Sequence, residues 1–422
     1  MNRKFWENLI SLCGVHVLNY IMPLLTLPFL ARVLGPVHWG ELAFAEAYAS
    51  YISVFIEYGF GLSATREVAS IRDDPAARSR LLAGVLGAQV LLTVFALALT
   101  LALAYGSNQF TAYRSLLPFA FSLGVLRAVN PFWYFQGLER MRLMASMMVA
   151  TNVAAAAGIL LFVRAPQDSW MPLTFRSGAA LISVAASLAI AYRDTPLSFP
   201  MLARALHSLR QGWSLFMLKG AVSLYTTGNV VLLGLLAGPN VVAIFAGAEK
   251  IANAAASGVN PIAQAFYPRI SYLVAKDRRN APRIARLSLL MTVGSGLLLG
   301  LTLLIGAPFL VHMLLGARFD QVVPVLRVLS VLPPLIAASS VLGIQWMLPL
   351  RLDKQFNWII LAAGVVNILL SICLVPRYGQ MGMASSVIVA EMIVTGSLIF
   401  VLRHRRLDPW SEQPQQEEAI AV

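Results

Sequence analysis

Long apolar stretches separated by short polar ones run along the whole chain. Most of them are about 20 residues long, the length that an α-helix needs to cross the hydrocarbon core of a bilayer. The pattern predicts about twelve membrane-spanning helices, at residues 9–34, 40–62, 81–105, 115–135, 146–163, 171–192, 212–236, 241–265, 287–315, 322–348, 356–375 and 382–402. We therefore expect an all-α polytopic membrane protein, because a helix satisfies its own backbone hydrogen bonds in lipid.

Composition strengthens this interpretation. Of the 422 residues 58% are hydrophobic and only 12% are charged, and the mean hydropathy is +0.73. Soluble proteins carry about 25% charged residues, so much of this surface must face lipid. The start, "MNRKFWENLISLCG", resembles a signal peptide, but no A-x-A-like cleavage site follows, so we expect an uncleaved first span.

Basic residues are distributed unevenly between the predicted loops. If the N-terminus is cytoplasmic, 22 of the 32 Lys and Arg lie in inner segments and 4 in outer segments. Cytoplasmic loops collect basic residues, so the pattern predicts that both termini are cytoplasmic. The same rule explains the net charge of +13, and we expect no nucleic-acid partner.

Nothing in the chain has the spacing of an enzyme site. The outer loops are too short for a catalytic domain, the five His are scattered, and Cys13 and Cys373 form no metal-binding or disulfide pattern. A phosphate-binding GxxxxGK[ST] loop is also missing from the sequence. We therefore expect no catalytic residue, no metal ligand and no cofactor. Residues 407–422 are polar and are predicted to form a disordered cytoplasmic tail.

The two halves of the chain are similar to each other. A shift of 203 residues aligns Gly35 with Gly238, Glu46 with Glu249 and Arg66 with Arg269. The pattern predicts two six-helix bundles, residues 1–205 and 206–406, each beginning on the same side of the membrane. Parallel repeats of this kind enclose a central cavity in many transporters.

A few ionisable residues lie within the predicted spans, where they usually face a protein interior or a water-filled cavity. Arg127 lies near the middle of its span, just before Asn130 and Pro131. It is either one partner of a structural ion pair or, as we favour, part of an anion-binding site. Lys219 and Lys250 are further cationic candidates, whereas Arg176 lies near an outer end, where snorkelling to the headgroups would explain it.

Glutamates line one face of the second span. Glu46 and Glu57 are eleven residues apart, which places both on the same face of a helix and ~16 Å apart along it. Together with Glu249 they are predicted to line a cavity and to couple transport to protons. The alternative is a packed carboxyl group that is hydrogen-bonded to a hydroxyl such as that of Tyr48 or Tyr51. For Glu57, and likewise for Lys219, which lie closer to the inner face, snorkelling to the headgroups is the alternative.

Several motifs resemble those of the Wzx-type polysaccharide flippases. They are "NYIMPLLTLPFLARVLGPVHWGELAFAEAY" at 19–48, "YGFGLSATREVA" at 58–69, "PFWYFQGLERMR" at 131–142, "AGAEKIANAAASGVNPIAQAFYPRIS" at 246–271 and "GIQWMLPLRLDKQFN" at 343–357. This family belongs to the multidrug/oligosaccharidyl-lipid/polysaccharide exporter superfamily. The resemblance implies two six-helix bundles around a cavity, and a function as a flippase that turns an undecaprenyl-diphosphate-linked oligosaccharide from the inner to the outer leaflet of the bacterial inner membrane.

Such a substrate needs positive charge for its diphosphate and hydrogen bonds for its sugars. Candidates for the diphosphate are Arg127, Lys219 and Lys250, and candidates for the sugars are Asn19, Tyr48, Asn130 and Gln136. Candidates at the cytoplasmic mouth are Arg66, Arg140, Arg142 and Arg269, for which ordinary positive-inside charge is the alternative. Trp133 and Tyr134 are interpreted as interfacial aromatic residues rather than as sugar-stacking ones.

Two other functions remain open from the sequence. One is a multidrug or small-molecule exporter of the same superfamily, and the other is a membrane polymerase or glycosyltransferase, against which the short outer loops argue. The expected partners are the lipid-linked oligosaccharide and inner-membrane lipids. A polysaccharide polymerase and a chain-length regulator are candidate protein partners in O-antigen, capsule or exopolysaccharide synthesis.

Overall fold

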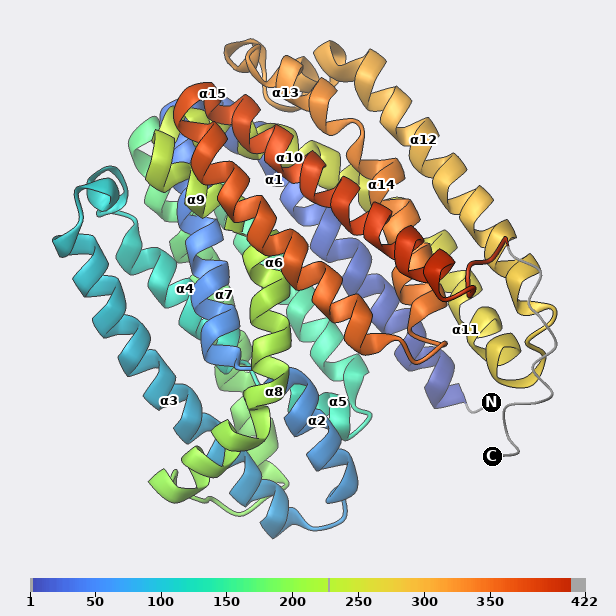
Figure 1. The fold of residues 1–422 in the computed structure, drawn as a ribbon. Coiled ribbons are helices and arrows are strands. Elements are labelled where there is room, and N and C mark those ends of the chain that lie inside the picture. The colour runs from blue at the N-terminus through green and yellow to red at the C-terminus, as the bar shows by residue number, and fades with distance from the viewer. Residues whose placement is uncertain (1–2, 227, 411–422) are drawn as a thin grey trace. The chain divides into compact units, whose positions relative to one another are not determined.

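The described part of the chain is helical. A computed structural model describes residues 3–226 and 228–410, and every regular element within these ranges is a helix (Figure 1). The side chains of residues 3–25, 142, 214–215, 218–219 and 221–226 lie outside the description. The all-α class predicted from the apolar pattern is confirmed.

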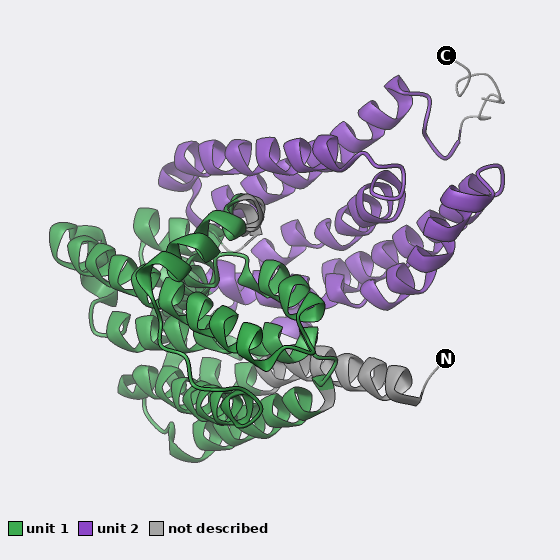
Figure 2. Ribbon diagram, turned by 90° about the horizontal axis from the view of Figure 1, so that it is seen from below, with its two compact units in different colours: residues 1–243, 313–319 green, residues 244–312, 320–422 purple. Residues whose placement is uncertain are grey.

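The chain divides into two compact units, which Figure 2 shows in separate colours: residues 1–243 with 313–319, and residues 244–312 with 320–422. Unit 1 contains α1 (Arg3–Glu57), α2 (Phe60–Ser70), α3 (Pro75–Gly106), η1 (Asn108–Tyr113), α4 (Leu117–Val129), α5 (Phe132–Gly137), α6 (Met141–Phe162), η2 (Pro166–Trp170), α7 (Met171–Arg193), α8 (Leu202–Thr226), α9 (Gly228–Ala237) and η3 (Ala317–Phe319). Unit 2 contains α11 (Asn260–Lys276), α13 (Val322–Leu329), α14 (Leu332–Ser339), the π-helix η4 (Ser340–Met347) and α15 (Asp353–His404). Two helices, α10 (Pro239–Ser257) and α12 (Ala281–Leu314), contribute residues to both units.

The predicted boundary between the bundles, at residues 205 and 206, falls within α8. This helix packs against α3 and is therefore counted with unit 1 by its contacts. Units are defined by contacts and the predicted bundles by internal repetition, so the division at 205 and 206 stays a prediction.

Six helical segments of the described residues are long and apolar enough to cross a membrane. They are Pro75–Gly106, Leu143–Phe162, Pro166–Arg193, Ala281–Leu314, Val322–Met347 and Asp353–His404. The twelve predicted spans fall mainly on helices, but their exact number and the side on which the termini lie stay predictions.

Glycine breaks the two longest helices. Gly35 in α1 has a φ of 71°, and Gly379 in α15 has a φ of 54°. A residue with a Cβ rarely adopts these angles, whereas glycine does so without steric cost. Each glycine lies between two predicted spans, so α1 and α15 are each a pair of helices joined at a glycine.

The outer face of α3 shows why the chain needs a lipid environment. Large apolar residues at helical spacing are exposed along it, namely Val90, Val94, Leu97 and Leu101. The residues that α3 buries are mostly small, namely Gly84, Ala88, Ala96, Thr100 and Ala104. Small buried residues allow close helix packing, and exposed apolar residues face hydrocarbon, as in a membrane-spanning helix.

The motif at 131–142 lies inside the protein. Trp133, Tyr134 and Phe135 are each at most 3% exposed and pack in a cluster with Phe60 of α2 and Leu82 of α3. The interfacial interpretation of Trp133 and Tyr134 is therefore wrong, because these side chains form the core between α2, α3 and α5. Tyr134 also accepts a hydrogen bond from the buried Arg78 at 3.1 Å.

Unit 2 contains a comparable cluster. Trp346 of η4 packs with Ile270 of α11 and with residues of α12 and α15. In unit 1 α2 packs against α5, and in unit 2 α11 packs against η4. Since the 203-residue shift carries α2 onto α11, the contacts within each unit agree with the proposed internal repeat.

The first residues of the predicted tail are packed against unit 2. Trp346 Nε1 donates to the Leu407 carbonyl at 2.7 Å, and the Arg286 guanidinium donates to the Pro409 carbonyl. The prediction of disorder is therefore wrong for residues 407–410. Residues 411–422 lie outside the described part of the chain.

Helices α1 and α4 approach so closely that one position has no room for a side chain. A Cβ added to Gly124 would lie 2.6 Å from the Ala49 carbonyl oxygen and 2.7 Å from Ile52 Cβ. The Ala49 backbone and the β-branched Ile52 side chain can move only slightly, so the close contact between α1 and α4 depends on glycine at position 124.

We expect Gly124→Val to lower the stability of the protein by about 1–3 kcal/mol through overpacking. The measurement is the midpoint of thermal unfolding of the purified protein in detergent. Gly178→Ala is the matched control, because Gly178 lies in α7 with no atom within 4 Å of an added Cβ. A Gly124→Val variant that unfolds at the same temperature as this control would contradict the packing.

Candidate functional site

An ion pair joins two helices of unit 1 within their apolar segments. The Arg176 guanidinium of α7 donates to the Glu46 carboxylate of α1. Only 20% and 16% of these side chains, respectively, are exposed. Arg176 therefore does not simply snorkel to the headgroups, as its position in the sequence suggested, but neutralises a partly buried carboxylate.

Arg127 lies close to this ion pair. Its guanidinium is within electrostatic range of both Arg176 and Glu46, and the residue is exposed. An exposed arginine on an apolar helix is costly in lipid, so such residues usually face water-filled space. The three side chains come from α4, α7 and α1, and we call them the Arg127 cluster.

The end of α4 sets the position of Arg127. Asn130 has an extended ψ of 118°, and Pro131 supplies no N–H, so α4 ends at Val129. The carbonyl of Ala128 has lost its helical partner and instead accepts from the buried Gln89 Nε2 at 2.8 Å. Arg127 thus lies in the last turn of its helix, where the helix dipole favours a cation.

A second hydrogen bond fixes α4 to α7. Asn130 Nδ2 donates to Ser183 Oγ at 3.0 Å. Ser183 follows Arg176 by two helical turns, so the same face of α7 contacts both the ion pair and the end of α4. These contacts between α1, α4 and α7 therefore fix the geometry of the Arg127 cluster.

The charges of the Arg127 cluster do not cancel. Within this cluster of described residues, two guanidinium groups lie near one carboxylate, so the cluster itself carries one excess positive charge. Guanidinium groups bind phosphate oxygens through pairs of parallel hydrogen bonds. The cluster can therefore attract an anion, and a phosphate-bearing one fits it best.

The predicted sugar-binding residues have different surroundings. Tyr48 is 7% exposed and donates to Thr100 Oγ1 at 2.6 Å, because the Thr100 proton is given to the Ala96 carbonyl. A sugar contact would require that bond to open. Asn130 and Gln136 are half-buried, and the side chain of Asn19 lies outside the described residues.

Residues predicted at the cytoplasmic mouth are mostly exposed. Arg66 and Arg269 are exposed, and the guanidinium of Arg269 lies 5.8 Å from the centre of the Tyr272 ring. Arg140 is paired with Asp194, while the side chain of Arg142 lies outside the described residues. Their roles stay predictions.

The other predicted charges are not part of the Arg127 cluster as described. Glu57, Glu249 and Lys250 are half-buried, and Glu249 and Lys250 belong to unit 2. Lys219 has its side chain outside the described residues. A shared cavity for these groups and Arg127 stays a prediction.

Sequence reasoning missed Arg176 and Arg78 as interior residues. Arg176 was close enough to a span end for snorkelling to explain it, and Arg78 was counted among loop charges. The sequence did contain a signal: an ionised Glu46 within an apolar span favours a cationic partner, and few basic residues lie within the predicted spans.

Comparisons with known proteins agree with this architecture. The family model for polysaccharide biosynthesis proteins matches residues 5–274. Relatives described as "Putative O-antigen transporter" occur in Escherichia coli (strain K12), at 32% identity, and in Shigella dysenteriae, at 29% identity. These alignments cover 95% and 94% of this chain and 97% and 99% of the relatives.

Solved structures show the same fold at low identity. The lipid II flippase MurJ in its inward closed conformation has a TM-score of 0.77 and 13% identity, covering 92% of this chain and 86% of MurJ. The MATE multidrug transporter DinF-BH has a TM-score of 0.54 and 16% identity, covering 96% of this chain and 95% of that transporter.

The relatives are named as transporters, and the two structural neighbours are a flippase and a transporter. The names of the relatives support a transporter of polysaccharide synthesis, and the two solved structures show that the fold is shared. The chain belongs to the polysaccharide biosynthesis protein family and is a multi-pass protein of the bacterial inner membrane.

Proposed function

We propose that the protein moves an undecaprenyl-diphosphate-linked oligosaccharide from the inner to the outer leaflet by alternating access. The observation that carries this proposal is the excess positive charge of the Arg127 cluster inside the apolar helices of unit 1. A diphosphate with attached sugars cannot cross hydrocarbon unaided, since each charge loses its hydration. The cluster replaces that hydration with guanidinium groups.

Arg127 and Arg176 have complementary parts in the proposed binding step. Arg127, which among the described residues has no ion pair of the kind that joins Arg176 to Glu46, is proposed to contact the diphosphate first. Arg176 is held by Glu46 while the site is empty and turns toward the second phosphate when the substrate arrives. Lys219 and Lys250 are proposed to add charge from their helices.

Polar residues around the cluster are proposed to bind the sugars. Asn130 is nearest in sequence, because it ends the helix that carries Arg127, and its amide oxygen can accept a hydrogen bond while its Nδ2 donates to Ser183. Asn19, Tyr48 and Gln136 are the further candidates. The lipid chain stays in the bilayer, while Arg66, Arg140, Arg142 and Arg269 attract the headgroup at the cytoplasmic mouth.

The proposed architecture is twelve spans in two parallel six-helix bundles with both termini in the cytoplasm. The uneven distribution of Lys and Arg supports the orientation, and the similar contacts of α2 with α5 and of α11 with η4 support the repeat. A polysaccharide polymerase and a chain-length regulator would act on the delivered unit in the outer leaflet.

A multidrug exporter is the second candidate, because the fold is shared with a multidrug transporter. Exporters of cationic drugs need an acidic or aromatic site, whereas the Arg127 cluster is net positive. The charge of the site therefore favours the lipid-linked oligosaccharide.

In a strain deleted for this gene, we expect undecaprenyl-diphosphate oligosaccharide to accumulate in the inner leaflet and surface polysaccharide to disappear. Wild-type protein should restore both, whereas Arg127→Ala should reduce surface polysaccharide by about 30-fold or more, as expected for truncating one partner of a close charge pair. The measurements are leaflet-specific labelling of the lipid and immunoblots of polysaccharide and protein.

Arg72→Ala is the matched control, since Arg72 is an exposed arginine in the turn before α3. It should restore polysaccharide fully. Normal polysaccharide with Arg127→Ala at equal protein abundance would refute the role of Arg127, and normal lipid distribution in the deletion strain would refute the function.

Glu46→Gln separates proton coupling from a counter-ion role. If Glu46 carries a proton, the variant should transport more slowly and lose most of the pH dependence of the wild type in vesicles with an imposed pH gradient. If Glu46 only neutralises Arg176, the pH profile should keep its shape while the rate changes.

The double variant Glu46→Gln/Arg176→Gln provides the control for this experiment. Glu46→Gln alone leaves the Arg176 guanidinium without its counter-ion. The double variant also removes that guanidinium, so it should recover part of the stability that Glu46→Gln loses. An unchanged rate and pH profile for Glu46→Gln would contradict both roles.

A further inference from the structure

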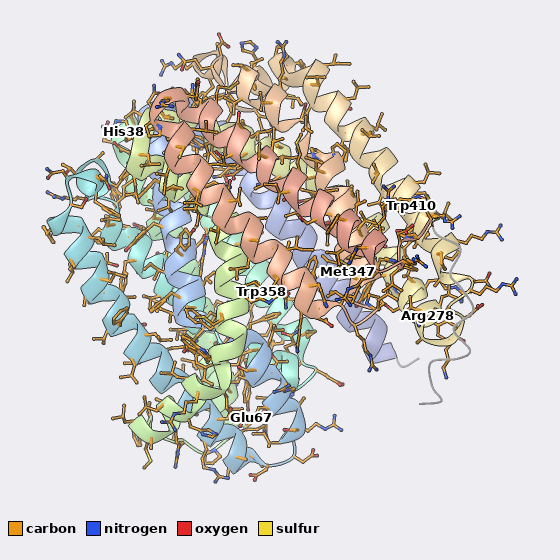
Figure 3. The ribbon with its side chains drawn as sticks, in the orientation of Figure 1. His38, Glu67, Arg278, Met347, Trp358 and Trp410 are labelled. Atoms are coloured by element: carbon orange, nitrogen blue, oxygen red, sulfur yellow. The ribbon has the colours of Figure 1, made fainter. Side chains whose placement is uncertain are left out.

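A cavity of about 420 Å³ lies where α2 ends and where α3 and α8 begin. Arg80 and Arg204 line it together with His207 and one carboxylate, that of Glu67, which Figure 3 labels at this end of unit 1. Two arginines against one carboxylate make the charged lining net positive. The cavity belongs to unit 1 alone and is formed by other helices than the Arg127 cluster.

Close packing of α3 and α8 fixes one of these arginines at the cavity wall. A Cβ on Gly84 would lie 3.1 Å from Ser208 Oγ and 3.5 Å from Arg204 Cβ. The guanidinium of Arg204 is also held from one side, because Nη1 donates to Ser198 Oγ at 3.0 Å. Its remaining N–H groups are thus presented from a defined position.

Ser198 belongs to a connecting segment, residues 196–201, that is attached to the protein at alternate positions. The Pro196 carbonyl accepts from Ser79 Oγ, and Ser198 accepts from Arg204. Pro200 lies against Gly87, where an added Cβ would be 3.1 Å from Pro200 Cβ. The even-numbered residues therefore fasten this segment to α3 and α8.

The odd-numbered residues of the same segment are large, apolar and exposed. Leu197, Phe199 and Met201 are 78%, 83% and 56% exposed, and Leu202 and Leu206 at the start of α8 continue the apolar surface. Water is a poor solvent for such a surface. Exposed apolar residues beside arginines are typical of segments that lie in the interface of an anionic membrane.

We propose that this cavity binds the phosphate group of an anionic phospholipid and that Leu197, Phe199 and Met201 insert into the same leaflet. Arg204 links the two features, since it lines the cavity and bonds the residue between Leu197 and Phe199. Arg80 and Arg204 supply the hydrogen bonds that phosphate oxygens accept. Free phosphate could enter the cavity, but it would leave the apolar surface uncovered.

Such a bound lipid would hold the connection between α7 and α8 at the membrane surface. This connection also joins the two predicted six-helix bundles. The site therefore places a lipid of the surrounding leaflet at the connection between the two predicted bundles.

Native mass spectrometry of the full-length protein tests the phosphate site. We expect wild type to retain phosphatidylglycerol in preference to phosphatidylcholine. Each removed cation near an anionic membrane surface weakens binding about fivefold, so Arg80→Gln/Arg204→Gln should lower the affinity for phosphatidylglycerol about 25-fold. Arg204→Lys should keep most of it.

The matched control is Arg72→Gln/Arg278→Gln, which removes the same charge from two exposed positions outside the cavity. It should bind phosphatidylglycerol as wild type does. An equal loss in both double variants, or no preference for phosphatidylglycerol, would overturn the site. Displacement of the lipid by millimolar inorganic phosphate, with retention of phosphate itself, would show that the source is free phosphate and overturn the lipid assignment.

Spin labelling tests the insertion of the connecting segment. In a cysteine-free protein in phosphatidylglycerol nanodiscs, a nitroxide at Phe199→Cys should be reached by oxygen and shielded from a water-soluble nickel chelate. A nitroxide at Asp73→Cys, in the polar turn before α3 where that side chain is 98% exposed, should show the reverse. A water-exposed label at both positions would overturn the insertion.

Discussion

An ionised carboxylate among apolar helices needs compensation for its lost hydration, and an ion pair that provides it connects the helices of unit 1. Glu46 on α1 is neutralised by Arg176 on α7, and Arg127 on α4 lies beside them. Breaking this partly buried ion pair would leave an uncompensated charge among apolar side chains and would destabilise the arrangement. The three helices are therefore held in one arrangement by a polar contact, although most of their surface is apolar. The second guanidinium then leaves a positive charge where an anionic substrate would pass.

Close helix packing makes this arrangement possible. Gly124 lets α1 and α4 approach until an added Cβ would contact the Ala49 carbonyl. The interruption at Asn130 and Pro131 ends α4 directly after Arg127, and the buried Gln89 satisfies the carbonyl that the interruption releases. Gly124, Pro131 and the buried amide of Gln89 thus together fix the position of the long Arg127 side chain.

The motif that is most recognisable in the sequence serves packing. Trp133, Tyr134 and Phe135 are buried between α2, α3 and α5, and Arg78 contributes a buried hydrogen bond to Tyr134. The corresponding cluster of unit 2 contains Trp346 on a π-helix, which also holds the start of the C-terminal segment. Family resemblance in such motifs therefore reflects a shared core, while the residues that meet a substrate need not stand out in sequence.

The amino-acid sequence was sufficient to predict the helical membrane class, the family and most helix positions. Apolar length and the distribution of Lys and Arg are local properties, so they are readable along one chain. Arg127 and Glu46 also stood out, because a charge in an apolar run is unusual wherever it is. The pairing of Arg176 with Glu46, 130 residues away, and the joint burial of Tyr134 and Arg78 became known from the folded protein. Such pairings depend on which helix faces pack against each other, and a single helix contains no information about its neighbour.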